Sequence, residues 1–152
     1  MKRKSRVFRI SVIAAFSALA FVLFLFEFPI IPGVEHLKFD LGDIPAFIGG
    51  LSFGPVAGIL IELIKNLLQL FTKGIGSTMG YGNIMNFLVG IAMVVPFVLI
   101  YRKYIKSWGY LKTVLISGLA GLVSIVVVGF LGNLLIAPFY FKQFLGIELT
   151  NE

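Results

Sequence analysis

The sequence predicts an all-α integral membrane protein, built as one bundle of membrane-spanning helices. Hydrophobic residues make up 59% of the chain and charged residues only 13%. A soluble domain has about 45–50% apolar residues and about 25% charged residues. A water-soluble protein of this size could not bury so much apolar surface in one core. The apolar residues also form runs long enough to cross a hydrocarbon core of about 30 Å. We expect a single membrane domain over residues 1–152.

The first apolar run, about residues 8–28, predicts a membrane-spanning helix after a basic N-terminal stretch. A cleavable signal peptide with the small-residue triplet Ala18-Leu19-Ala20 is the alternative. We favour a permanent span because the run stays apolar through Phe26, beyond that triplet. Ala14 and Ala18 form a small-xxx-small pattern in this helix. Such a pattern serves either packing within the protein or docking of a partner, and spacing alone favours internal packing.

A polar stretch with two prolines, residues 29–43, precedes a long apolar segment that is broken at Gly54-Pro55. Gly-Pro marks turns, and proline favours the first position of a helix, so we predict two helices, about 44–53 and 55–71. Charge supports this hairpin. With the N-terminus inside, a hairpin leaves the basic loop at 102–112 inside, as the positive-inside rule prefers. The first limb is short, so it either begins earlier or lies in protein-lined surroundings.

A glycine-rich link over 72–83 leads to a fourth helix, about 84–101, and a fifth, about 114–138. Two basic clusters flank the apolar runs and contain no acid, which is typical of cytoplasmic loops near anionic lipid headgroups rather than of nucleic-acid binding. Five spans then leave the C-terminus outside, and six of the seven acids fall outside or at the outer interface. The basic clusters are Lys2, Arg3, Lys4, Arg6 and Arg9, then Arg102, Lys103, Lys106 and Lys112.

Polar side chains within the predicted spans are the candidates for function. Glu62 and Lys65 lie one turn apart, so they form either an ion pair that fixes helix packing or part of a ligand or coupling site. Asn66 follows directly, Asn86 opens the fourth helix, and Asn133 lies in the fifth. Asparagine amides suit a flat heterocycle with imide and carbonyl groups. They also suit interhelical hydrogen bonds, which the residues alone favour slightly.

Catalytic and metal-binding patterns are missing from the sequence. It has no cysteine, a single histidine, no P-loop and no dinucleotide-binding glycine pattern. We therefore expect neither an enzyme nor a bound metal or cofactor. Active uptake would need energy from another subunit or an ion gradient.

Five segments carry a resemblance to a known family: LKFDLGDIPA from Leu37, FGPVAG from Phe53, ELIKNLL from Glu62, GNIMNF from Gly82 and NLLIAPFY from Asn133. Together they resemble the riboflavin-specific S components of energy-coupling factor (ECF) transporters. The resemblance covers nearly the whole chain, in the right order. It implies a six-helix bundle that captures riboflavin at the outer side of a bacterial cytoplasmic membrane. The partners it implies are a transmembrane coupling subunit and two ATPase subunits.

The resemblance also implies roles for single residues. Ala14 and Ala18 match the family's docking motif, so the resemblance implies that they contact the coupling subunit. This replaces the internal packing that spacing alone favours. Asn133 matches a position that hydrogen-bonds the flavin ring, and Leu37 lies in the loop that covers the ligand. The full set of ligand-binding candidates is Leu37, Asp40, Lys65, Asn66, Asn86 and Asn133.

The sequence departs from the family pattern at its end. Family members continue into a sixth helix with further polar ligand contacts, which this sequence lacks. Either the sequence is truncated or the protein has no sixth helix and fewer ligand contacts, and we expect truncation. Two alternatives to a riboflavin-binding subunit remain at this point. One is an S component for another vitamin, because pocket residues rather than the fold select the ligand. The other is a non-transport scaffold protein of the membrane.

Overall fold

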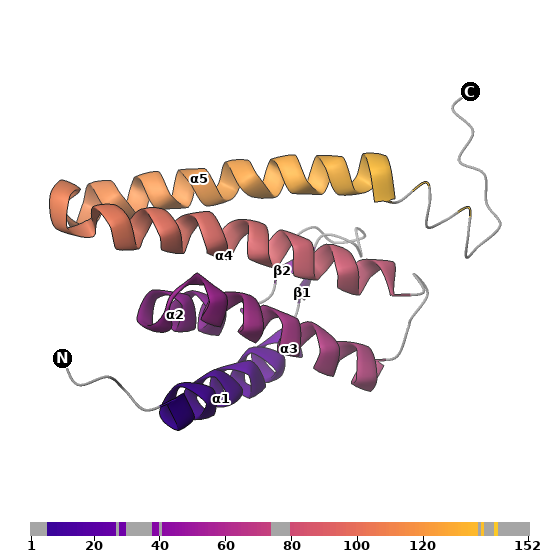
Figure 1. Ribbon diagram of the computed structural model, residues 1–152. Helices are drawn as coiled ribbons and strands as arrows, with labels where there is room; N and C mark the ends of the chain where they lie inside the picture. The colour runs from indigo at the N-terminus through magenta and orange to yellow at the C-terminus, as the bar shows by residue number, and fades with distance from the viewer. Residues whose placement is uncertain are drawn as a thin grey trace.

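A computed structural model describes residues 6–26, 28–29, 38–39, 41–73, 80–136, 138 and 142, and these residues form a helical bundle (Figure 1). Four of its helices are long and apolar enough to cross a membrane, namely α1, α3, α4 and α5. This confirms the predicted class, a polytopic all-α membrane protein. The elements are α1 (Arg6–Phe24), β1 (Phe28–Pro29), β2 (Lys38–Phe39), α2 (Ile44–Phe53), α3 (Pro55–Lys73), α4 (Tyr81–Trp108), α5 (Tyr110–Leu131) and a π-helical turn, η1 (Gly132–Ile136).

The break between α2 and α3 lies at Gly54, where the Gly-Pro pair predicts it. Gly54 has a φ of +105°, a conformation that residues with a Cβ rarely adopt, and its N–H donates to the Gly50 carbonyl at 2.8 Å. Pro55 then begins α3. Because α2 has 10 residues, its length of about 15 Å covers only half of a hydrocarbon core.

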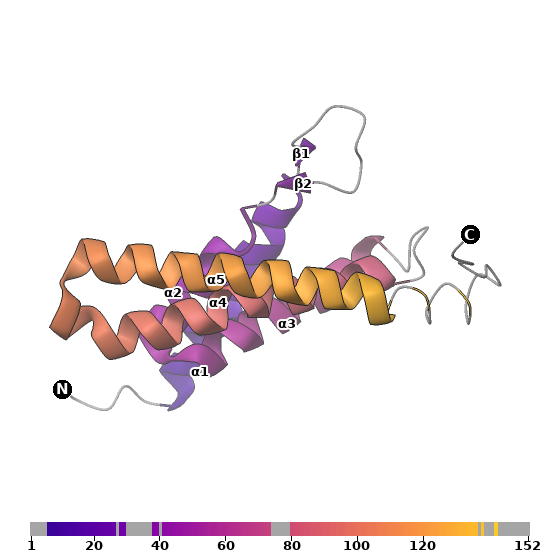
Figure 2. The same ribbon diagram turned by 90° about the horizontal axis from the view of Figure 1, so that it is seen from above.

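The helices form layers around α3 and α4. Helices α1 and α2 pack on α3, and α5 packs on α4 (Figure 1). Figure 2 shows α1 crossing the other helices at a clear angle, with the β1–β2 pair at its far end. That antiparallel pair sets Phe28 opposite Phe39 and Pro29 opposite Lys38. The buried core lies where α1 to α4 meet and consists of Ala20, Ala46, Ile61, Val94 and Val98.

Helix α4 and the start of α5 reach further than the apolar runs indicate, whereas α5 ends at Leu131 and the π-helical turn η1 follows it. The stretch expected to be a basic loop is helical except for Gly109, which has a φ of +78°. Apolar runs mark only the part of a helix that lies in hydrocarbon, whereas lysine and arginine are good helix formers that continue it into the headgroup region. Tyr104 and Trp108 stack there with ring centroids 4.0 Å apart. Such aromatic residues are typical of a membrane interface.

Candidate ligand and partner sites

A buried ion cluster joins α2, α3 and α4. The side chains of Lys65 and Glu62 are both 0% exposed, and Lys65 Nζ lies 2.8 Å from Glu62 Oε2. Lys65 also forms a salt bridge with Asp43, which directly precedes α2. Asp43 and Lys65 are equally far from Gly54 in sequence, so the antiparallel α2–α3 hairpin sets them opposite each other.

Helix α4 leaves room for this cluster at Gly90. A Cβ at this position would lie 2.6 Å from Glu62 Oε2 and 2.9 Å from Glu62 Cδ. Any larger residue would therefore displace the carboxylate or separate α3 from α4. Charges removed from water are costly unless they stay paired, so the cluster fixes the register of α2 and α4 against α3.

Two asparagines extend the polar cluster along α3 and α4. Asn66 is buried, and its Nδ2 donates to the Glu62 carbonyl at 2.8 Å. Asn86 Nδ2 donates to Asn66 Oδ1 at 3.2 Å, so a side-chain hydrogen bond joins the two helices. The structure thus brings together three predicted candidates, Lys65, Asn66 and Asn86.

The other ligand candidates lie elsewhere. Asn133 is exposed in η1, and its Nδ2 donates to the Gly129 carbonyl at 2.9 Å. The preceding Gly132 packs against Met85, because a Cβ on it would lie 2.4 Å from Met85 Cε. Asn133 is therefore at the same end of the bundle as Asn86. Leu37 and Asp40 lie outside the described residues.

Sequence reasoning missed Asp43 as a partner of Lys65. The signal was present, since a tight turn at Gly54 fixes which residues of the two limbs face each other. The same geometry shows that α3 extends beyond the start of α2 (Figure 1). The polar residues Lys65, Asn66 and Asn86 lie where α2 ceases to accompany α3, toward the end at which α3 finishes and α4 begins.

The small-residue face of α1 points away from the bundle. Ala14 and Ala18 are exposed, whereas Ser17, Ala20 and Phe24 are buried against the other helices. The internal packing that spacing alone favours for Ala14 and Ala18 is therefore wrong, and these alanines are accessible to another helix.

Two arginines from different basic clusters converge on the C-terminal end of α2. Arg9 Nη2 donates to the Phe53 carbonyl at 3.1 Å, and Arg102 Nη1 donates to the Leu51 carbonyl at 2.9 Å. Cations at a helix C-terminus satisfy the last carbonyls and oppose the helix dipole. Arg9 and Arg102 thus lie at one end of the bundle, opposite the end that carries Asn86 and Asn133.

The fold and these sites define a membrane-embedded helical protein with an outward-facing helix surface and a polar cluster between its helices. The chain matches the family model described as "ECF transporter, substrate-specific component" over residues 8–151. It belongs to that family, and is the substrate-specific component of an ECF transporter.

Individual relatives agree with this assignment. The chain is 35% identical to the riboflavin transporter FmnP of Bacillus subtilis (strain 168) over 136 residues, which cover 89% of this chain and 70% of that protein. It is 34% identical to the riboflavin transporter RibU of Staphylococcus aureus (strain TCH60), covering 100% of this chain and 76% of that protein. The solved S component of a bacterial ECF transporter has a TM-score of 0.71 at 31% identity, over 90% of this chain and 77% of that one.

Proposed function

We propose that this chain captures riboflavin at the outer side of a bacterial cytoplasmic membrane. It then delivers the vitamin inward together with a transmembrane coupling subunit and two ATPase subunits. The observation that carries the proposal is the similarity to FmnP and RibU, both riboflavin transporters, at 35% and 34% identity over most of this chain.

The amides near one end of the bundle are the proposed contacts of the flavin ring. Asn133 is exposed there, and Asn86 is half-buried. Each amide carries two donors and one acceptor, which suits the imide and carbonyl edge of an isoalloxazine. Lys65 and Asn66 are buried beneath them, so their proposed role is to hold the site in place. Leu37 and Asp40 belong to the proposed covering loop.

The proposed orientation places the N-terminus in the cytoplasm. Arg9 and Arg102, one from each basic cluster, lie at the same end of α2, and the positive-inside rule assigns such an end to the cytoplasm. The amides then lie toward the outer side, where capture takes place. The exposed Ala14 and Ala18 form the proposed docking face for the coupling subunit, because small residues allow close helix approach in lipid.

Flavin fluorescence provides the direct test of the proposed ligand. We expect riboflavin to lose fluorescence saturably when it is titrated with the purified protein, with one site per chain. Thiamine and biotin, added in excess, should not displace it. Absence of saturable quenching, or displacement by another vitamin at similar concentration, would contradict the proposal and favour an S component for a different ligand.

A further inference from the structure

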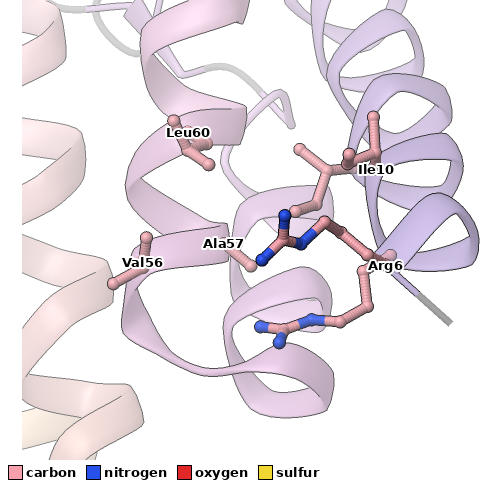
Figure 3. Close-up of a pocket in the computed structure, with 7 residues that line it drawn as sticks. Arg6, Ile10, Val56, Ala57 and Leu60 are labelled. Atoms are coloured by element: carbon pink, nitrogen blue, oxygen red, sulfur yellow. The ribbon is translucent and has the colours of Figure 1, made fainter. Parts of the chain in front are cut away.

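A groove of about 510 Å³ lies between the first turns of α1 and α3 and is separate from the amides. This volume is within the range of small-molecule sites. Figure 3 shows Arg6 and Ile10 on α1 extending toward Ala57 on α3, and Val56 and Leu60 of α3 line the groove as well. The groove lies beside the end of α2 to which Arg9 is hydrogen-bonded.

One end of the groove is strongly positive. Arg6 and Arg9 both line it, and residues at i and i+3 lie on the same face of a helix. Arg9 uses one N–H to bond the Phe53 carbonyl, which fixes its position and leaves other donors of its guanidinium. The acids of the described residues, Asp43 and Glu62, both contact Lys65 and so do not neutralise the groove.

The start of α3 also borders this end of the groove. Helix α3 begins at Pro55, next to the groove-lining Val56 and Ala57. The N-terminus of a helix carries a partial positive charge and favours anions. The C-terminus of α2 ends beside it and carries the opposite partial charge. The two guanidinium groups are therefore the main positive charges at this end of the groove.

The rest of the groove is apolar and open to the bilayer. Ile10 and Ile13 of α1 face Val56 and Leu60 of α3, and all four lie in segments long and apolar enough to span the membrane. Val56 is 64% exposed. A molecule in this groove thus meets cationic groups at one end and hydrocarbon along its length.

We propose that the groove binds an anionic phospholipid, with its phosphate at Arg6 and Arg9 and an acyl chain along the four apolar side chains. Basic residues attract the anionic lipids of the cytoplasmic leaflet, the side at which the proposed orientation places this end of the bundle. The site does not depend on which vitamin the protein carries. It also leaves Ala18 open, since Ala18 lies about a third of a turn around α1 from the groove-lining residues, whereas Ala14 lies one turn along from Ile10 and borders the groove.

Native mass spectrometry of the purified full chain tests this proposal, with phosphatidylglycerol and phosphatidylcholine of identical acyl chains as probes. We expect one phosphatidylglycerol to be retained in preference to phosphatidylcholine. The variant R6Q/R9Q should bind phosphatidylglycerol roughly 10- to 30-fold more weakly, because each basic residue near the surface contributes a factor of about five to the affinity. The control K103Q/K106Q removes the same charge from exposed positions at the end of α4 and should bind as the wild type does.

A second variant leaves both charges in place. Val56→Trp fills the groove at an exposed position and should also displace the lipid, whereas Leu119→Trp, on the exposed face of α5, should not. This pair keeps the test informative if R6Q/R9Q disturbs the end of α2. Equal retention of phosphatidylglycerol by the wild type, R6Q/R9Q and Val56→Trp would overturn the proposal. Equal retention of the two lipids by the wild type would overturn it as well.

Discussion

Replacement of Lys65 by methionine tests the ion cluster at its centre. Methionine keeps most of the side-chain volume but removes the ammonium that pairs with Glu62 and Asp43. Glu62 is then left as a fully buried carboxylate, and breaking a buried pair in this way costs about 3–5 kcal/mol. We expect the free energy of unfolding of Lys65→Met to fall by about that amount.

The assay is equilibrium unfolding of the purified protein in mixed detergent micelles, followed by circular dichroism. Lys106→Met serves as the control, because Lys106 is exposed in the last turn of α4. Adding Glu62→Gln to Lys65→Met removes the unpaired charge, so the double variant should recover part of the loss. A Lys65→Met protein within about 1 kcal/mol of the wild type, the range of an exposed pair, would refute this account of the cluster. A double variant no more stable than the single one would refute it too.

Three further predictions concern packing, docking and orientation. Gly90→Ala should destabilise the bundle by about 1–3 kcal/mol, since its Cβ would lie 2.6 Å from Glu62 Oε2. Gly118→Ala, whose Cβ would have nothing within 4 Å, is the control in the same unfolding assay. Equal stability of the two variants would contradict the close packing of α4 on Glu62. Ala14→Leu/Ala18→Leu should leave riboflavin binding intact but abolish co-purification with the coupling subunit, whereas Leu119→Ala should keep both. Undiminished co-purification of the double variant would exclude this face as the docking surface. The chain has no cysteine, so in intact cells a membrane-impermeant maleimide should label Thr72→Cys and spare Ser107→Cys, and the reverse pattern would invert the proposed topology.

Much of the fold is predictable from the sequence because a chain that crosses lipid must satisfy its backbone hydrogen bonds internally, which restricts its spans to helices here. Apolar runs indicate the spanning helices, and Gly54-Pro55 locates the hairpin because few other residues allow its backbone. The ends of α4 and α5 are less predictable. Hydropathy reports the depth of the hydrocarbon, whereas helix propensity and the Tyr104–Trp108 stack carry these helices beyond it.

The sites are harder to predict, because they depend on which face of each helix turns inward. The spacing of Ala14 and Ala18 alone favours internal contacts over external ones, and only the packing of Ser17 and Ala20 against the bundle shows which face turns inward. Lys65 is identifiable as a buried cation from its place in a span. Its second partner, Asp43, can be identified only when the register of the α2–α3 hairpin is known. Asn66 and Asn86 are joined by tertiary contact alone.

Riboflavin affinity, measured on the wild type and on Asn133→Leu, tests whether this chain binds riboflavin and whether the Asn133 amide contacts it. We expect saturable binding by the wild type and a loss of about 1–3 kcal/mol in binding free energy for Asn133→Leu, the cost of one hydrogen bond to the flavin ring. Ser52→Leu, a similar polar-to-apolar change at the opposite end of the bundle, should bind riboflavin as the wild type does. A wild-type protein that binds no riboflavin would contradict the proposed function. Equal affinities of the wild type and Asn133→Leu would remove this amide from the binding site.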